Sequence, residues 1–139
     1  MIAVVIGVAP PLDRAEALSV SVLDTNDRLL RAFTTADGRW RLPLDPAETD
    51  ERYLAMLQAY EDKRFRSHWG VDLYALARAA GQLVRRGHIV SGASTLTMQT
   101  ARLLEGDHER TASGKLRQMV RALQLERRMS KDKILRLYL

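Results

Sequence analysis

The sequence contains no cysteine, few prolines and few aromatic residues. Its 139 residues include zero cysteines, four prolines and 6% aromatic side chains. The absence of cysteine excludes a disulfide framework, a cysteine-ligated zinc site and a cysteine nucleophile. Hydrophobic residues make up 46% and charged residues 28% of the chain, which is typical of a globular domain and argues against disorder. The length suits one domain and leaves no room for two catalytic ones.

The sequence also lacks a long hydrophobic run. The apolar stretch over residues 1–9 stops at Pro10 and Pro11, whereas a helix that spans a bilayer needs about 20 residues. It has neither the basic region nor the clean cleavage site of a secretory signal peptide. The pattern leaves two interpretations open, a buried strand or the end of a membrane helix. We expect residues 1–17 to be a linker or the remnant of a membrane anchor.

Acidic residues are scarce at the C-terminal end. Residues 110–139 contain nine Lys and Arg against two Asp and Glu, which leaves this segment at +7, while the whole chain carries +5. Such a basic segment suits a polyanionic partner, which could be nucleic acid, an anionic membrane surface or a phosphate-bearing substrate. A solvated helix face without any partner is the alternative, and charge alone does not decide between them.

Two kinds of pattern divide the chain near residue 46. Residues 18–24 and 28–34 alternate like strands around a Thr-Asn-Asp turn, which predicts a hairpin in a β-rich connector over 18–46. From 47 to 139 the apolar spacing is helical and predicts a mainly α domain. Because the last helix has no stop signal, we expect that domain to be truncated at its C-terminus. The expected helices are 53–60, 72–86, 95–104, 115–129 and 131–139, with N-caps at Asp72, Ser94, Ser113 and Ser130.

The first group of candidate functional residues begins with two adjacent carboxylates. Glu61 and Asp62 are followed by Phe65, His68 and Gly70. A carboxylate in a cleft can act as a general base towards a sugar hydroxyl, and rings beside it can wall or orient it. A capping network at the end of a helix would explain the same residues without any chemistry.

The second group is a glycine followed by a hydroxyl-rich helix start. It comprises Gly92, Ser94, Thr95, Thr97 and Gln99. Free backbone N–H groups and hydroxyls at a helix N-terminus can hold an anion or a phosphate. The alternative is an ordinary serine cap on a helix.

The third group lies on the basic C-terminal segment. Lys115, Gln118 and Arg121 recur at helical spacing and would form one polar stripe. Such a stripe could hold a pyrophosphate through charge-assisted hydrogen bonds. A solvated helix face is again the alternative.

Taken in order, these groups resemble the motifs of the peptidoglycan glycosyltransferase domain (glycosyltransferase family 51) of class A penicillin-binding proteins. The family motif Glu-Asp-x-x-Phe-x-x-His-x-Gly is complete here at residues 61–70. The motif Gly-x-Ser-Thr-Ile-Thr-Gln-Gln matches at 92–99, apart from Leu96 and from Met98 in place of the first glutamine. The pattern Ser-Lys-x-x-Ile-Leu-x-x-Tyr-Leu matches at 130–139. The resemblance covers roughly residues 18–139.

The chain departs from the family in the motif Arg-Lys-x-x-Glu. Lys115 matches, but Gly114 stands in place of the arginine and Gln118 in place of the second catalytic glutamate. Together with Met98 and the run at 122–126, these substitutions are most like the penicillin-binding protein 1C branch of the family. The match stops at residue 139, so the resemblance implies the N-terminal portion of such a domain.

The resemblance implies a fold and an activity. The fold would be a lysozyme-like helical lobe, and the activity would be polymerisation of lipid II with inversion at the anomeric carbon and loss of undecaprenyl pyrophosphate. Glu61 would be the general base, and Gln118 would occupy the second catalytic position. Lys115 and Arg102 would be the cations that stabilise the leaving group. The implied substrate contacts are Asp62, Phe65, His68, Gly70, Gly92, Ser94, Thr95, Thr97, Gln99, Arg102 and Lys115.

The resemblance also implies partners and a location. The partners would be lipid II, the growing glycan chain and an anionic membrane surface, with a transpeptidase domain in the full-length protein and no nucleic acid. The location would be the inner (cytoplasmic) membrane, with the domain facing the periplasm. The one candidate cofactor is a divalent cation, Mg²⁺ or Mn²⁺, whose ligands stay unassigned. Because the neutral Gln118 is a poor ligand for a hard cation, we expect reduced or metal-insensitive activity.

Three rival interpretations remain open at this stage. The domain could be a catalytically weak or silent scaffold of a cell-wall complex, because Gln118 replaces a glutamate. A lysozyme-type hydrolase would share the fold and a catalytic glutamate but would not need the hydroxyl-rich helix start. A helix-turn-helix nucleic-acid binder would explain the basic charge, and the three ordered motifs argue against it.

Overall fold

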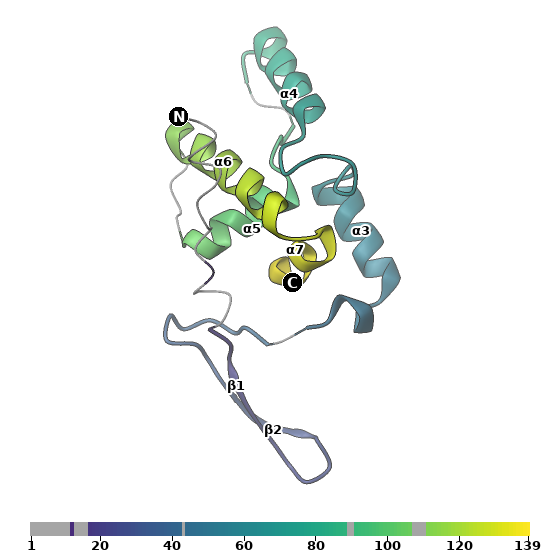
Figure 1. Cartoon of the computed structure of the whole chain (residues 1–139), viewed down its shortest axis with the longest axis vertical. Coiled ribbons are helices and arrows are strands. Elements are labelled where there is room, and N and C mark those ends of the chain that lie inside the picture. Colours follow the sequence, from purple (N-terminus) through teal and green to yellow (C-terminus); the bar gives the residue numbers. More distant parts are fainter. Residues whose placement is uncertain (1–11, 13–16, 43, 89–90, 107–110) are drawn as a thin grey trace.

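The chain folds into a mainly α-helical body with a separate β-hairpin at one end (Figure 1). The computed structural model describes residues 12, 17–42, 44–88, 91–106 and 111–139. The predicted fold class, mainly α after a short β-rich segment, is confirmed, while most of the predicted linker or anchor at 1–17 lies outside the described residues. The elements are β1 (Val20–Leu23), β2 (Leu29–Phe33), the 3₁₀ helix η1 (Pro46–Glu48), α3 (Glu51–Glu61), α4 (Leu73–Arg86), α5 (Leu96–Glu105), α6 (Ala112–Arg128) and α7 (Lys131–Tyr138).

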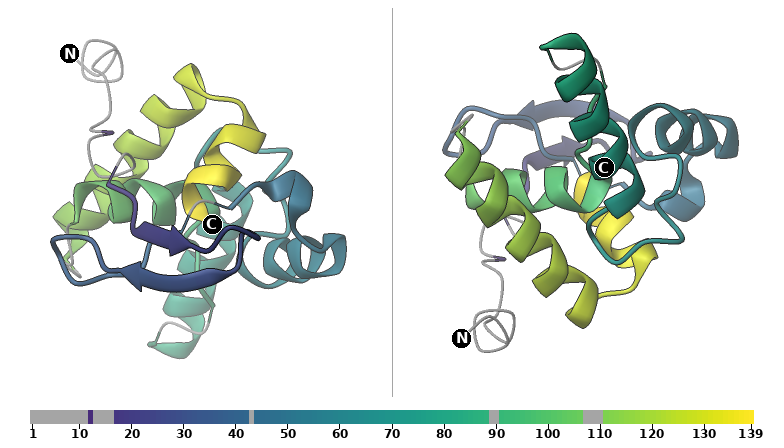
Figure 2. Two further views of the ribbon diagram at one scale, coloured as in Figure 1. Left: turned by 90° about the horizontal axis from the view of Figure 1, so that it is seen from below. Right: turned by 90° about the horizontal axis from the view of Figure 1, so that it is seen from above.

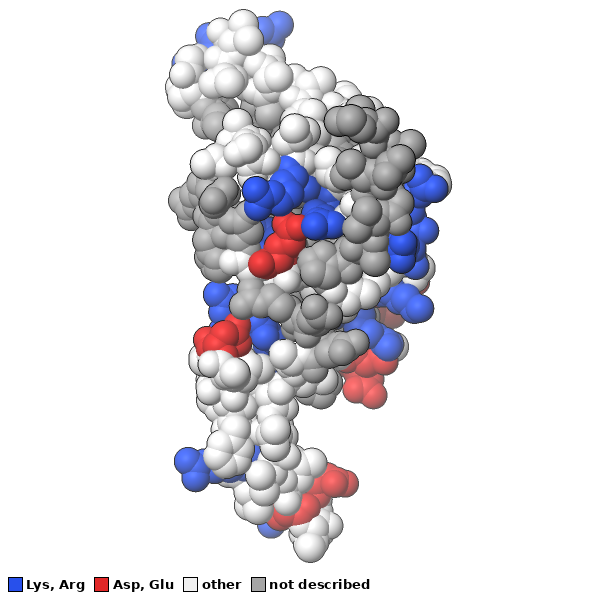
Figure 3. All heavy atoms as spheres, turned by 60° about the vertical axis from the view of Figure 1, so that its left-hand side comes forward, with Lys and Arg blue, Asp and Glu red and all other residues white. Residues whose placement is uncertain are grey.

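The predicted hairpin is confirmed and is held by its turn. Strands β1 and β2 pair antiparallel, with Val20 opposite Phe33 and a bulge between Val22 and Leu23. The Asp24 carboxylate accepts hydrogen bonds from the backbone N–H groups of Asn26 and Arg28 at 2.8 and 2.9 Å. These bonds, together with the Arg28 side chain, lower the pKa of Asp24. In Figure 3 the surface of the hairpin is largely uncharged between its tip and the helical body.

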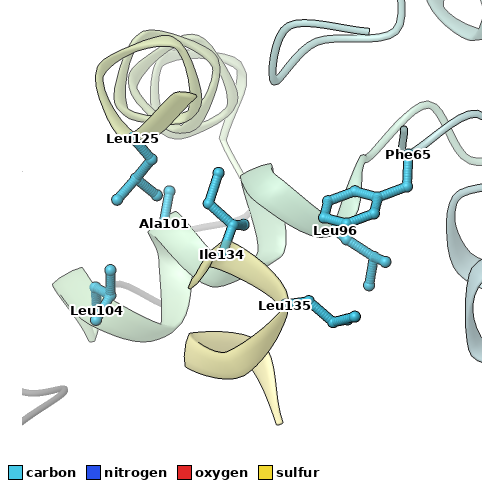
Figure 4. Close-up of a cluster of buried hydrophobic side chains, with 7 residues drawn as sticks. All are labelled: Phe65, Leu96, Ala101, Leu104, Leu125, Ile134 and Leu135. Carbon is cyan, nitrogen blue, oxygen red and sulfur yellow. The ribbon is translucent and has the colours of Figure 1, made fainter. Parts of the chain in front are cut away.

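Helix α5 lies at the centre of the hydrophobic core. Its Leu96, Ala101 and Leu104 are buried and pack with Leu125 of α6 and with two residues of α7, Ile134 and Leu135. Figure 4 shows these side chains converging from the three helices, with Phe65 entering from the loop after α3. Apolar residues spaced three to five positions apart place one face of α5 against both partners. The core thereby fixes the helix that carries the second group of candidate residues.

Two of the four predicted helix caps are wrong by a small shift in sequence. Asp72 and Ser130 cap α4 and α7 as expected. Helix α5, however, is capped by Thr95 instead of Ser94, because the Thr95 hydroxyl accepts the Met98 N–H at 3.1 Å. Helix α6 begins at Ala112 and is capped by Thr111 instead of Ser113. In both cases a neighbouring threonine, Thr95 or Thr111, has the extended backbone conformation that a cap requires.

Helix α4 projects from the helical body, as Figure 1 and both views of Figure 2 show. Ala75 is its buried residue, whereas the apolar Leu73 and Val84 are 73% and 86% exposed. Arg85 and Arg86 lie in its last turn. The apolar face indicated by the sequence spacing therefore lies at the surface of the described structure. No helix within the described part of the chain is long and apolar enough to cross a bilayer.

Gly70 occupies a position that no other residue can take without strain. Its φ is +80°, and a Cβ built there would lie 2.8 Å from the carbonyl carbon and oxygen of Ala122 on α6. We expect Gly70→Ala to lower the free energy of unfolding by about 2–4 kcal/mol through overpacking and backbone strain. Urea denaturation measures this loss. The control is Gly81→Ala on α4, where the added Cβ meets nothing within 4 Å and should stabilise the helix slightly; equal midpoints for the two variants would contradict the expectation.

Candidate active site

A cleft of about 610 Å³ opens between the end of α3, the start of α4 and the start of α5. Acidic and basic side chains both line it, with hydroxyl groups from the segment before α5. Glu61 lies at the end of α3, and Gln99 and Arg102 lie on α5. The cleft thus brings together residues of the first and second predicted groups.

Glu61 is the last residue of α3 and is half-buried in the lining of this cleft. Its Oε2 atom accepts a hydrogen bond of 2.9 Å from the side-chain amide of Gln99. The charge of Glu61 also acts on Tyr138 of α7. Burial, and then the Glu61 carboxylate, raise the pKa of the Tyr138 phenol. A carboxylate held by one donor and open to a cleft keeps lone pairs available to accept a proton.

Asp62 also lines the cleft, but its side chain is buried and its carboxylate is held by contacts inside the protein. Its carboxylate accepts hydrogen bonds from His68 Nε2 at 2.9 and 3.0 Å and from the backbone N–H of Leu96 at 2.9 Å. Asp62 is 6% exposed and Phe65 is 1% exposed, and the Phe65 ring meets His68 edge to face at 6.4 Å between ring centroids. Asp62 therefore joins the end of α3 to α5 and to His68, and the His68 ring packs against Phe65.

The second predicted group divides between the cleft and the interior. Gly92, Ser94, Thr95 and Gln99 line the cleft, and Thr95 also donates its hydroxyl proton to the Gly70 carbonyl at 2.5 Å. Thr97 lies inside the protein, where its hydroxyl donates to Glu126 of α6 at 2.7 Å. Glu126 in turn pairs with Lys131 of α7 at 2.6 Å. Thr97 thus links three helices, away from the cleft.

Lys115 of α6 reaches the cleft through Ser94. The Lys115 ammonium donates a hydrogen bond to the Ser94 hydroxyl, which lines the cleft. Burial, and then the nearby charge of Arg102, lowers the pKa of Lys115 below its ordinary value. Arg102 is exposed on the cleft side of α5. Arg102 and the Ser94 hydroxyl therefore line the cleft, with the Lys115 ammonium bonded to that hydroxyl from α6, and an anionic group could bind there.

Gln118 lies one turn beyond Lys115 on α6 and is half-buried. It does not appear in the described lining of the cleft. Within the described residues, no three carboxylate or imidazole side chains gather closely enough to hold a metal ion. The neutral amide of Gln118 supplies no charge for a hard cation. Among the described residues, the donor set therefore does not fit Mg²⁺ or Mn²⁺.

The cleft also contains charged residues that the motifs did not indicate. Lys63, Arg64 and Arg78 line it, and Arg64 pairs with Asp72 at 2.6 Å. Burial opposes the ionisation of Asp72, but the Ala75 N–H and Arg64 outweigh it and lower the pKa of Asp72. The signal for these residues was present in the sequence, because Lys63 and Arg64 directly follow the carboxylate pair. Their side chains make this side of the cleft basic as well.

Fold and cleft together define a helical domain whose cleft is lined by three carboxylates, of which Glu61 is the least buried, and by basic and hydroxyl-bearing side chains. Comparison with known proteins gives the family. The family model described as Transglycosylase matches residues 26–139, and the chain belongs to this transglycosylase family.

Three relatives illustrate the match. The chain is 47% identical over 129 residues to penicillin-binding protein 1C of Escherichia coli K12, which covers 93% of the chain and 16% of that protein. It is 43% identical over 98 residues to penicillin-binding protein 1A of Pseudomonas aeruginosa PAO1, covering 70% of the chain and 12% of the relative. With penicillin-binding protein 1A of Neisseria gonorrhoeae it shares 48% identity over 80 residues, 58% of the chain and 10% of the relative. The resemblance seen in the motifs is confirmed, and the chain spans a sixth or less of these relatives.

Proposed function

We propose that the chain forms part of a peptidoglycan glycosyltransferase that polymerises lipid II into glycan strands, with Glu61 as the general base. The observation that carries this proposal is that Glu61, Ser94 and Arg102 line one cleft, with the Lys115 ammonium bonded to the Ser94 hydroxyl. Membership of the transglycosylase family and the match to penicillin-binding proteins support the same reaction.

In the proposed reaction the growing glycan chain is the donor and the sugar 4-hydroxyl of lipid II is the acceptor. Glu61 removes the hydroxyl proton as the new glycosidic bond forms, and the bond from the anomeric carbon to the pyrophosphate oxygen breaks with inversion. The negative charge that develops on the pyrophosphate is stabilised by Lys115 and Arg102. Ser94 adds a hydroxyl donor to the same group. One carboxylate is sufficient, because a pyrophosphate leaves without the help of a carboxylic acid.

The contacts of Asp62 argue against a lysozyme-type hydrolase. Such enzymes use two carboxylates that flank the scissile bond. Asp62 is buried and accepts hydrogen bonds from His68 and from Leu96, so it is not free to serve as the second one. The basic wall of the cleft, by contrast, suits a phosphate-bearing substrate.

The proposal extends to a membrane surface and to a longer protein. Helix α4 exposes apolar side chains and carries Arg85 and Arg86 at its end, a combination that suits the surface of an anionic bilayer. We propose that the domain faces the periplasm from the inner membrane and that a transpeptidase domain lies in the same full-length protein. Lipid II and the growing glycan chain are the proposed ligands, and nucleic acid is not among them.

The alternative, a silent scaffold, rests on Gln118 and is decided by assay. A full-length protein that carries this chain is incubated with lipid II over a range of Mg²⁺ concentrations, beside its Gln118→Glu variant. We expect the wild type to form glycan at a rate that does not depend on Mg²⁺, because Gln118 brings no charge for the cation. Glycan from Gln118→Glu alone would overturn the proposal and identify the natural protein as a scaffold.

A further inference from the structure

The two adjacent carboxylates at the end of α3 are both tied to the same helix. Glu61 accepts from the Gln99 amide at 2.9 Å, and Asp62 accepts from the Leu96 N–H at 2.9 Å. The partners lie within the first turn of α5, although 38 and 34 residues separate them from the carboxylates in sequence. The orientation of Glu61 is therefore set by a remote helix as well as by its own.

The N-terminal turn of α5, which carries Gln99, is held in a fixed position. Its cap, Thr95, accepts the Met98 N–H and donates to the Gly70 carbonyl, and both Thr95 and Leu96 are buried. The Gln99 N–H itself bonds to the Thr95 carbonyl at 3.0 Å. Since the backbone on either side of Gln99 is fixed in the core, the Cα atom from which the amide reaches Glu61 is held in place.

The chemistry of the contact determines which end of the amide meets Glu61. An ionised carboxylate only accepts hydrogen bonds, so the NH₂ group of Gln99 must face it and the amide oxygen must face away. The bond occupies Oε2, and no other described residue forms a hydrogen bond with Oε1, which can accept a proton. A carboxylate rotates readily about its last bond, and a fixed donor on one oxygen selects the orientation in which the other faces the cleft.

We propose that Gln99 is a positioning residue, whose amide holds Glu61 in the orientation that accepts the proton of the acceptor hydroxyl. This inference rests on the proposed function and deepens it. It assigns Gln99 a role that differs from the substrate contact expected from the motif. A substrate contact would act on binding, whereas a positioning residue acts on the chemical step.

The test is the steady-state kinetics of lipid II polymerisation by the full-length protein and its Gln99→Met variant. Methionine preserves the length of the side chain and removes the donor. We expect kcat to fall by about 10- to 100-fold because the base is no longer held in its productive geometry, while KM stays within about twofold. The matched control is Gln58→Met on α3, a half-buried glutamine outside the described lining of the cleft, which should leave both constants unchanged.

Each other outcome has a separate meaning. A raised KM at unchanged kcat, or no change in either constant, would overturn the positioning role and leave the proposed function intact. No glycan from the wild type, or full activity of Glu61→Gln measured beside it, would overturn the proposed function and this inference together. Thermal melting checks that the variants fold. If Gln99→Met does not fold, Gln99→Glu replaces it, since it keeps the shape and exchanges the donor for a second carboxylate, and it is judged by the same change in kcat and KM.

Discussion

Glu61→Gln should lower the rate of lipid II polymerisation by about 10²- to 10⁴-fold, which is the usual contribution of a general base. The amide has nearly the same shape as the carboxylate but cannot accept the proton of the acceptor hydroxyl. Glu61 lines the cleft, and the one hydrogen bond that it forms with a side chain among the described residues, that of Gln99, is one that an amide oxygen can still accept. Folding should therefore be preserved, and thermal melting together with the glycan assay separates the two effects.

The matched control for this variant is Glu51→Gln. Glu51 is the first residue of the same helix and is exposed, outside the described lining of the cleft. Glu51→Gln should leave the rate unchanged within about twofold, because an exposed side chain outside the cleft contributes little to stability or to the reaction. If both variants are active, Glu61 is not the base. If both are equally impaired, the loss reflects the charge of α3 and not proton transfer.

Lys115→Met should lower the rate by about 10²- to 10³-fold, the range observed when one donor to a developing negative charge is removed. Lys115 is half-buried and reaches the cleft at Ser94, so its charge is less screened than that of a surface lysine. Lys133→Met, an exposed lysine on α7, is the control and should retain its activity. Equal rates for the two variants would show that Lys115 does not stabilise the leaving group.

The pH dependence provides a second measurement on the same residue. Burial and the charge of Arg102 lower the pKa of Lys115, so the ammonium loses its proton at a lower pH than an exposed lysine would. Activity that depends on this cation is present below that pKa and is lost as the pH rises through it. Arg102→Gln removes the like charge and should move the alkaline limb of the rate profile to higher pH. A limb that stays in place would mean that another group titrates there.

The motifs located the cleft but not the division of roles within the first motif. Glu61, Asp62 and His68 are close in sequence, so their proximity in space follows from local structure. The inward direction of Asp62 does not follow, because its backbone partner Leu96 lies 34 residues away and meets it only in the folded chain. Sequence alone therefore predicted a carboxylate pair, while the structure distinguishes two carboxylates that line the cleft, the half-buried Glu61 and the buried Asp62.

The helices and their caps show the same limit at a smaller scale. The helical spacing from residue 47 onwards is a local property, and it predicted the mainly α fold. Ser94 and Thr95 are neighbours with similar hydroxyls, so pattern could not decide which of them caps α5. In the folded chain the Lys115 ammonium, 21 positions along, donates to the Ser94 hydroxyl, whereas the Thr95 hydroxyl donates to the Gly70 carbonyl and accepts the capping bond from the Met98 N–H. Likewise, the exposure of α4 depends on what surrounds it and not on its own spacing.

The packing of α5 against α6 and α7 also bears on the order in which the protein folds. These helices follow one another in sequence and share one core, so closing them together requires only short loops. The contacts from Glu61 and Asp62 to α5 span more than thirty residues and need a longer loop to close. Local contacts form faster than distant ones. The unit of α5, α6 and α7 should therefore form early. Glu61 and Gln99 should come into contact only later, when α3 packs against α5.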